Sequence, residues 1–304
     1  MKIIGTGLSG LIGSRISELL KDKYEFINFS TSTGFDITKK DSILDFFNSS
    51  QASVVIHLAG KTDVDGCEED KDRDLEILEI EELGKQQEEF EKINSAWSVN
   101  VIGTKNIADV CAKTNKKLIY ISSDFVFDGE KKDPYAEDDM PNPINWYGRT
   151  KHEGEKIVGS LDIPWAILRI SYPYRAHFQK KDFVRTIMEK LSDGESLKVV
   201  SDQIITPTFI DDLAFAFDQI IQNNLSGIYH TSGSDSLSPF EITRKIADIF
   251  GFDKTLISET TSGEFYKDRA RRPSNLALKN DKIVKLGASM KGIEGGLQAL
   301  KRQL

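Results

Sequence analysis

Gly7-Leu-Ser-Gly10-Leu-Ile-Gly13 decides the fold of this 304-residue chain, because it joins a short apolar run to a helical pattern. Met1–Ile4 has the character of a buried parallel strand, and from Gly10 to Leu20 the apolar residues recur at helical spacing. The glycines therefore predict a strand-to-helix turn that lets a phosphate approach the backbone at the helix N-terminus. An ordinary glycine-rich βα loop is the alternative for this segment taken alone.

Strand-like apolar runs alternate with helical stretches along the chain. They recur near Ile3, Phe26, Val54, Leu118, Ala166–Arg169 and Gly227–His230. This alternation is typical of an α/β fold with a Rossmann-type doubly wound parallel sheet. We expect a dinucleotide-binding domain over residues 1–170, to which residues 198–230 return. Residues 171–197 and 231–304 are expected to build a smaller mixed α/β lobe that binds the substrate.

Two further motifs supply groups for carbonyl chemistry. Ser123 ends an apolar stretch, and Tyr147 precedes Lys151 by four residues, so that both side chains share one face of a helix. Carbonyl reduction needs a hydride and a proton donor near the developing alkoxide, and a nearby ammonium favours the ionised form of a phenol. A plain surface pair is the alternative for Tyr147 and Lys151 alone. Together with the glycine turn, these residues indicate a nicotinamide-dependent oxidoreductase.

The sequence after the second apolar run bears on the choice of cofactor. Glu25–Phe29 leads into Ser30, where an NAD-binding chain often places a carboxylate against the ribose 2′-hydroxyl. This favours NADP, although no arginine stands there to hold a 2′-phosphate, and NAD stays open. Asp36 and Ile37 follow where a carboxylate could bond the adenine amino group, with a turn-capping Asp as the alternative.

Nearly the whole chain resembles the extended short-chain dehydrogenase/reductases and, within them, the dTDP-4-dehydrorhamnose reductases. The shared motifs are the glycine turn, Val54–Gly60, Thr62–Asp65, Asn100–Gly103, Ser122–Gly129, Pro134–Glu137, Tyr147–Lys151, Leu168–Ser171, Asp202–Gln203 and Ala270–Pro273. The resemblance implies that Tyr147 is the proton donor, Lys151 its partner and a ribose contact, and Ser123 the carbonyl-binding hydroxyl.

The resemblance also implies sets of cofactor-binding and substrate-binding residues. The expected cofactor contacts are Gly7, Ser9, Gly10, Leu11, Ile12, Ser30, Asp36, Ile37, Leu58, Ala59, Gly60, Thr62, Tyr147 and Lys151. The expected substrate contacts are Val64, Asp124, Phe125, Tyr172, Gln203, Arg271 and Arg272. The two arginines are included because a guanidinium matches the oxygens of a diphosphate, with a plain basic loop as the alternative.

The implied activity is the NAD(P)H-dependent reduction at C4 of a nucleotide-linked 4-keto-6-deoxy sugar, as in dTDP-rhamnose and polysaccharide biosynthesis. The related 4,6-dehydratases tend to carry Glu at the position of Phe125, so reduction fits better than water elimination. Phe125 and Tyr172 replace the Tyr and Trp usual in these reductases, which leaves the sugar open. A nucleotide-sugar epimerase or dehydratase and a non-catalytic regulatory subunit are the alternative functions.

An acidic segment over residues 68–95 departs from the family. Between Glu68 and Lys92 stand 12 acidic and 4 basic residues, so this segment accounts for the whole net charge of −8. Leucines and aromatic residues within it predict a helix with one apolar side. We expect a solvated helix beside the substrate cleft; a lid or a partner-binding element is the alternative, because the segment directly follows Thr62–Asp65.

The remaining features exclude several classes of protein. No basic surface with interleaved aromatic residues indicates a nucleic-acid partner, and no apolar stretch suits a membrane span or signal peptide. Cys67 and Cys111 have no metal or redox spacing, which fits a reduced cytoplasmic protein. Some relatives hold a divalent ion at a subunit contact. Arg15 replaces one such glutamate, so we expect no metal and leave a homodimer open.

Overall fold

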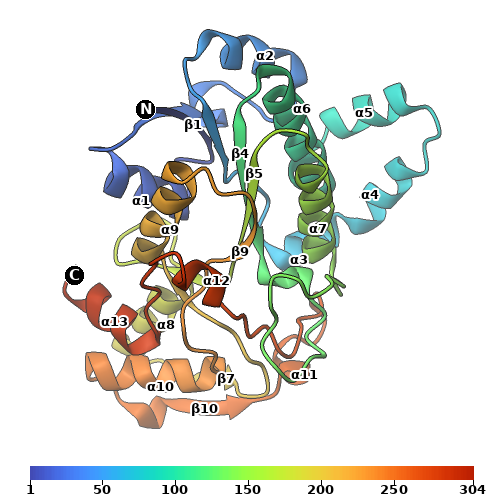
Figure 1. The fold of residues 1–304 in the computed structure, drawn as a ribbon. Coiled ribbons are helices and arrows are strands. Elements are labelled where there is room, and N and C mark those ends of the chain that lie inside the picture. The colour runs from blue at the N-terminus through green and yellow to red at the C-terminus, as the bar shows by residue number, and fades with distance from the viewer.

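One six-stranded parallel sheet forms the centre of the computed structural model, which describes residues 1–304 apart from the side chains of residues 41 and 42. The strand order is β2-β1-β3-β4-β5-β9 (Figure 1). The strands are β1 (Lys2–Thr6), β2 (Glu25–Phe29), β3 (Val54–His57), β4 (Lys117–Ser123), β5 (Trp165–Ile170) and β9 (Gly227–His230). This order confirms the predicted doubly wound sheet. Its direction reverses between β1 and β3, where such sheets bind ligands at the carboxyl ends of the strands.

Helices cover both faces of the sheet because successive residues of each strand point to opposite sides. Ile3 joins a core with α1 (Leu11–Leu20) and α9 (Ile210–Gln222). Ile4 joins a second core with α2 (Lys40–Ser49), α6 (Thr104–Thr114) and α7 (Trp146–Gly159). Figure 1 shows these two helical layers on either side of the strands. The near-continuous apolar strands are thus explained by burial on both faces.

A smaller unit with its own apolar core lies beyond the carboxyl ends of the strands. Tyr174, Val184, Ile246 and Leu297 are among its buried residues. Its elements are β6 (Pro173–Tyr174), α8 (Phe183–Ser192), β7 (Leu197–Val200), β8 (Thr208–Phe209), α10 (Pro239–Phe250), β10 (Ile257–Thr260), α11 (Ser262–Phe265) and α13 (Ile293–Lys301). Helix α12 (Asp281–Val284) instead packs against β9, and its Ile283 belongs to the core shared with α1 and α9. Two short sheets, β10-β7 and β6-β8, belong to the same half of the chain.

Residues 198–230 divide between the two parts of the molecule. We expected the whole range to rejoin the dinucleotide-binding domain. Helix α9 packs on the central sheet, and β9 pairs with β5. Strand β7 instead pairs with β10, outside the central sheet. The domain boundaries themselves stay a prediction.

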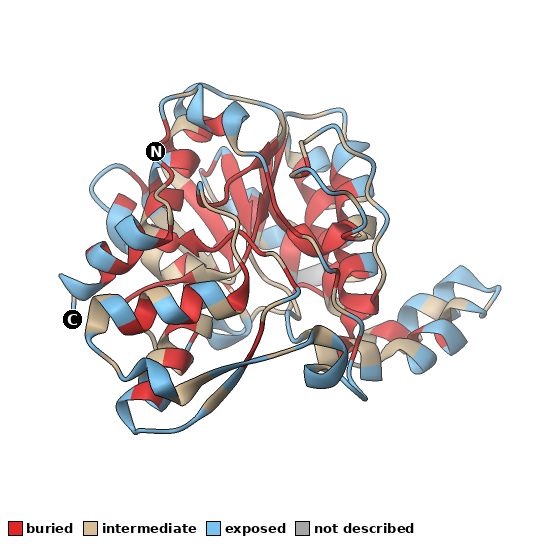
Figure 2. Ribbon diagram, turned by 90° about the horizontal axis from the view of Figure 1, so that it is seen from below, coloured by how far each residue is buried: buried red, intermediate tan, exposed pale blue. Residues whose placement is uncertain are grey.

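The acidic segment forms three short helices rather than one. These are α3 (Val64–Glu69), α4 (Lys71–Leu78) and α5 (Leu83–Glu91). Helices α4 and α5 project from the body of the molecule, and much of their surface is exposed (Figures 1 and 2). Glu79, Glu81 and Glu82 lie in the exposed turn between them, where water surrounds the carboxylates. Within the described part of the chain, no helix has the length and apolar character to span a membrane.

Helix α7 approaches β4 more closely than most residues would allow. A Cβ atom on Gly148 would lie 2.1 Å from the carbonyl oxygen of Phe125, and one on Gly154 would lie 2.4 Å from the phenol oxygen of Tyr120. The two glycines therefore permit this contact. It brings Tyr147 and Lys151 against the carboxyl end of β4.

We predict that Gly148→Ala lowers the free energy of unfolding by about 1–3 kcal/mol, the usual cost of overpacking a core. The new Cβ would clash with the backbone of Phe125, which cannot rotate away as a side chain could. Urea denaturation provides the measurement. Gly159→Ala is the matched control on the same helix, because its Cβ would meet only Trp165, at 4.0 Å. Equal stability of the two variants would contradict the prediction.

Candidate active site

A cavity of about 550 Å³ opens at the carboxyl ends of β1, β3 and β4. It brings together the glycine turn, the end of β4 and the first turns of α7, which are distant in sequence. The predicted site residues that line it are Gly7, Gly10, Leu11, Ile12, Leu58, Gly60, Thr62, Val64, Ser123, Asp124, Phe125, Tyr147, Lys151, Tyr172 and Arg272. The groups chosen for cofactor, catalysis and substrate thus share one cavity.

A second cavity, of about 450 Å³, adjoins the same glycine turn, since Gly7 lines both. The predicted residues that line it are Gly7, Ser9, Ser30, Asp36, Ile37 and Ala59. Asp36 also caps the turn that follows, because its Oδ1 accepts hydrogen bonds from the backbone N–H and the hydroxyl of Thr38, at 2.9 and 2.8 Å. The position of this cavity beside the end of β2 suits the adenosine half of a dinucleotide.

The turn between the two cavities fits a diphosphate. Gly7 has a φ of +70°, and a Cβ there would lie 2.7 Å from the backbone nitrogen of Ala59. A Cβ on Gly13 would lie 2.5 Å from the carbonyl oxygen of Gly7. The N-cap of α1 is Gly10, and no side chain caps this end of the helix. Its first N–H groups and the positive end of the helix dipole therefore suit an anion.

Ser123 and Asp124 form a buried polar pair at the end of β4. The hydroxyl of Ser123 donates to Oδ1 of Asp124 at 2.8 Å, and the hydroxyl of Ser171 donates to Oδ2 at 2.7 Å. Burial raises the pKa of the Asp124 carboxyl to about 6, against the opposing effect of these two hydrogen bonds. Asp124 therefore orients Ser123 and loses its charge more readily than an exposed aspartate.

Tyr147 is buried beside this pair, and its acidity differs from our expectation. We expected Lys151 to make the phenol more acidic. Instead, burial raises the pKa of Tyr147 above its ordinary value, and the hydrogen bond with Ser123 offsets only part of this effect. The reason is that charging a phenol without water around it is unfavourable. Tyr147 is therefore a protonated group at neutral pH, as a proton donor must be.

The ammonium of Lys151 is held by β4. It donates to the carbonyl oxygen of Ile121 at 2.7 Å and lies 4.2 Å from the centre of the Tyr120 ring. Burial lowers its pKa to about 7. Asn100 braces the same region: its Nδ2 donates to the carbonyl of Lys61 at 2.9 Å and to the hydroxyl of Thr150 at 3.0 Å.

Aromatic side chains form one wall of the larger cavity. The ring of Phe125 lies 5.6 Å from that of Tyr147 and 6.4 Å from that of Tyr172. Tyr172 has a φ of +40°, uncommon for a residue with a side chain. Its ring also meets Phe183 edge to face at 5.7 Å. The wall is apolar where a phenol at position 125 would have added a hydrogen-bonding group.

Two predicted substrate contacts, Gln203 and Arg271, line neither cavity. Gln203 is fully buried, and its amide donates to the carbonyl of Pro273 at 3.0 Å. Arg271 is exposed, while the neighbouring Arg272 turns inward. Nη1 of Arg272 lies 2.8 Å from Oδ1 of Asp65, and its guanidinium stacks 4.9 Å from the centre of the Tyr266 ring.

Several lining residues were missed. Asp182, Phe183 and Tyr266 line the larger cavity, and Glu91–Asn94 line the adenosine-side cavity. The C-terminal end of the acidic segment therefore borders this second cavity. Asp182 had a detectable signal, because it precedes an amphipathic stretch as a helix N-cap and accepts from the backbone N–H of Arg185 at 3.0 Å. The others depend on tertiary contacts between distant segments.

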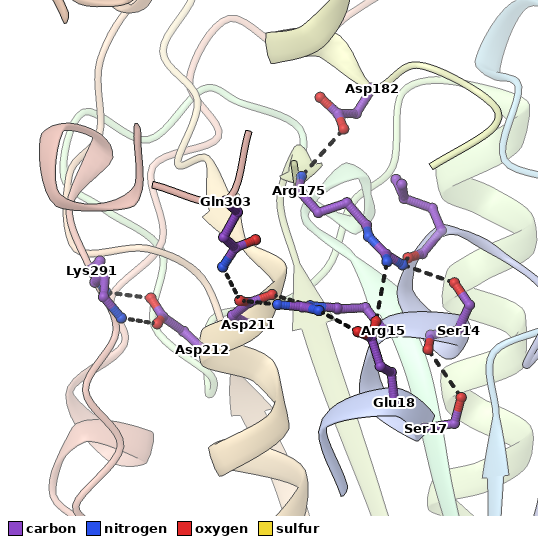
Figure 3. A network of polar contacts seen from close by, with 11 residues as sticks. Ser14, Arg15, Ser17, Glu18, Arg175, Asp182, Asp211, Asp212, Lys291 and Gln303 are labelled. Atoms are coloured by element: carbon purple, nitrogen blue, oxygen red, sulfur yellow. Dashed lines mark hydrogen bonds and ion pairs between the residues drawn. The ribbon is translucent and has the colours of Figure 1, made fainter. Parts of the chain in front are cut away.

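A polar network ties the lobe to the glycine turn and the start of α1 (Figure 3). Nη1 of Arg175 donates to the carbonyl of Leu11 at 3.1 Å and to the hydroxyl of Ser14 at 2.8 Å. Arg15 makes two hydrogen bonds to the carboxylate of Asp211, each of 2.7 Å, and the carboxamide of Gln303 donates to that carboxylate. The carboxylate of Asp211 is thus paired with the guanidinium of Arg15. Among the residues whose side chains are described, no group of His, Cys, Asp and Glu is arranged to hold a metal.

Comparison with known proteins finds similarity along nearly the whole chain. Residues 1–82 and 85–301 match the family model described as RmlD substrate binding domain. The dTDP-4-dehydrorhamnose reductase of Aggregatibacter actinomycetemcomitans is 30% identical over 295 residues, covering 93% of this chain and 92% of that protein. The methionine adenosyltransferase 2 subunit beta of Xenopus tropicalis is 29% identical, covering 93% and 81%.

A solved structure extends the similarity to three dimensions. The dTDP-4-dehydrorhamnose reductase of Bacillus anthracis, solved in complex with NADP, superposes with a TM-score of 0.85 at 29% identity. The match covers 100% of this chain and 99% of that one.

Arg272→Ala should weaken the binding of a nucleoside diphosphate by about 10- to 100-fold, because a hydrogen bond to a charged group contributes about 1.5–3 kcal/mol. Arg271→Ala serves as the control, since that side chain is exposed outside both cavities. Isothermal titration with thymidine diphosphate compares the two variants. A larger effect at position 271 would reverse the assignment.

The buried His57 predicts a loss of stability in mild acid. Burial, with a smaller effect of the Lys151 charge, lowers its pKa from 6.5 to about 3, so its contribution to stability is complete above pH 6.5 and is lost as the pH falls towards 3. Between pH 7.5 and 5.5, His57→Asn should lose less unfolding free energy than the native protein, by about 1 kcal/mol. Urea denaturation at both pH values measures this difference. Asp124 contributes the opposite slope in both proteins, and identical slopes would refute the role of His57.

Proposed function

We propose that this chain, which belongs to the RmlD substrate binding domain family, is an NADPH-dependent reductase of a nucleotide-linked 4-keto-6-deoxy sugar. The observation that carries the proposal is the single cavity shared by Ser123, Tyr147 and Lys151 with the glycine turn. The NADP-bound relative supports the choice of cofactor.

In this mechanism the chain orients the substrate carbonyl and supplies a proton. The bound nicotinamide supplies the hydride. Tyr147 donates its phenolic proton to the C4 oxygen, for which its raised pKa keeps it protonated beforehand. The hydroxyl of Ser123, which donates its single proton to Asp124 in this structure, would turn to donate it to the same oxygen when the substrate binds. Lys151 stabilises the negative charge that the phenol acquires, since burial strengthens an interaction between opposite charges.

The aromatic wall supports a 6-deoxy sugar as the substrate. Contact between a C6 methyl group and rings such as those of Phe125 and Tyr172 favours binding, whereas a C6 hydroxyl would need a hydrogen-bonding partner. Phe125 also provides no acid for water elimination, so reduction is favoured over the 4,6-dehydratase reaction. Arg272 is the proposed ligand of the substrate diphosphate, with Tyr266 stacked on it.

A non-catalytic regulatory subunit is the second candidate function. It is favoured by one observation, the relative named as subunit beta of methionine adenosyltransferase 2. The presence of Ser123, Tyr147 and Lys151 in one cavity favours catalysis instead. Co-purification with another enzyme, together with a cellular role that is indifferent to Tyr147→Phe, would select the regulatory function.

The test is the oxidation of NADPH with a panel of freshly generated 4-keto sugar nucleotides. Tyr147→Phe should reduce turnover by about 10²- to 10⁴-fold, the usual effect of removing a general acid. Native protein should oxidise NADPH at a rate proportional to the enzyme concentration. A Phe variant with full turnover would refute the role of Tyr147. Tightly held NAD, with no net oxidation of NADPH, would select an epimerase or dehydratase.

A further inference from the structure

The acidic segment contains a carboxylate that is buried, although the helix carrying it projects into water. Asp74 of α4 is fully buried, while its neighbours Asp72 and Glu76 are exposed. Oδ2 of Asp74 accepts two hydrogen bonds, one from the indole Nε1 of Trp146 at 2.8 Å and one from the backbone nitrogen of Trp97 at 3.0 Å. A carboxylate without such partners would be costly to bury. Asp74 therefore contacts the body of the protein directly.

The partner of Asp74 is the first residue of the helix that carries the proposed proton donor. Trp146 begins α7 and directly precedes Tyr147. Its backbone N–H donates to Oε2 of Glu68 at 2.7 Å, and its ring stacks on that of Trp97 with centres 5.5 Å apart. Oδ1 of the N-cap Asn145 accepts from the backbone N–H of Gly148 at 2.8 Å. Two acidic side chains of the segment thus hold the first turn of α7.

The base of the segment is attached at a second point, the loop that follows β3. Oδ2 of Asp70 accepts from the ammonium of Lys61 at 2.5 Å and from the backbone nitrogen of Ala96 at 2.7 Å. Lys61 lies between Gly60 and Thr62, which line the cavity. The acidic segment therefore contacts both the strand-end loop after β3 and the N-terminus of α7. Both elements contribute residues to the larger cavity.

We propose that Asp74 is a positioning residue for Tyr147, which it holds through the indole of Trp146. This inference rests on the proposed reductase function. The hydrogen bond that the indole of Trp146 donates to Asp74 fixes the rotation of the ring. The ring in turn fixes the first turn of α7 against Trp97. The phenol of Tyr147 is thereby kept at one distance from the substrate carbonyl. A displacement of about 1 Å at a reacting group lowers turnover by up to about 10²-fold.

The test compares two variants that break the same bond from opposite sides. Asp74→Ala removes the acceptor, and Trp146→Phe removes the donor but keeps an aromatic ring. Each should lower kcat by about tenfold and leave the KM for NADPH within about twofold, because the cofactor contacts are intact. The double variant should lose no more than either single variant, since one interaction connects the two residues.

The Asp74→Asn variant tests whether the hydrogen bonds of Asp74 or its negative charge position Tyr147. Both bonds end on the same oxygen, so the amide oxygen of Asn can accept them, and this variant should recover most of the lost turnover. Asp72→Ala is the matched control, because Asp72 is an exposed carboxylate on the same helix. It should leave kcat and both KM values unchanged.

The outcomes distinguish this inference from the proposed function. If the native protein oxidises no NADPH with any sugar nucleotide of the panel, the reductase function fails. If the native protein is active and folded Asp74→Ala turns over at the native rate, the positioning role is refuted. Additive losses in the double variant, or a fall in thermal stability with unchanged kcat, would also overturn it. Trp146→Phe keeps the test open should Asp74→Ala fail to fold.

Discussion

The close contact between α7 and β4 is the constraint on which the proposed site depends. Gly154 faces Tyr120 of the strand and Gly148 faces Phe125 in the turn that follows it, and at both positions a Cβ atom would hold the helix away. At this separation Lys151 reaches the carbonyl of Ile121, and Tyr147 lies beside Ser123. The proposed catalytic groups thus take their relative positions from a packing distance between two elements of secondary structure. A site built in this way needs little reorganisation when the substrate arrives.

Burial sets the protonation states in the cavity. It raises the pKa values of Tyr147 and Asp124 and lowers that of Lys151, because in each case the charged form loses its water. A small number of hydrogen bonds, most of them to β4 and its following turn, compensates for this loss. Around Ser123 the charged forms of the buried groups are therefore disfavoured, while Arg272, paired with Asp65, supplies a positive charge to the same cavity.

The fold was largely readable from sequence, since apolar runs and the glycine turn depend on local spacing. The acidic segment and the smaller lobe could be predicted from sequence to a lesser extent. Arg271 and Arg272 are adjacent with the same chemistry, and only the path of the chain decides which faces the cavity. Asp74 is one of 12 acidic residues in its segment, and its burial follows from contact with Trp146, 72 positions away. Tyr266 likewise enters the site through tertiary packing alone.

The attachment of the acidic segment has an evolutionary consequence. Asp70 and Ala96, where the segment leaves and rejoins the body, are joined by a hydrogen bond of 2.7 Å. A segment whose ends meet adds only the modest, logarithmic entropy of a longer loop and leaves the register of β3, β4 and α6 unaffected. Its outer half, including the exposed Leu83, is free to drift in sequence or length. Selection on its inner half would then preserve only the few side chains that touch the first turn of α7.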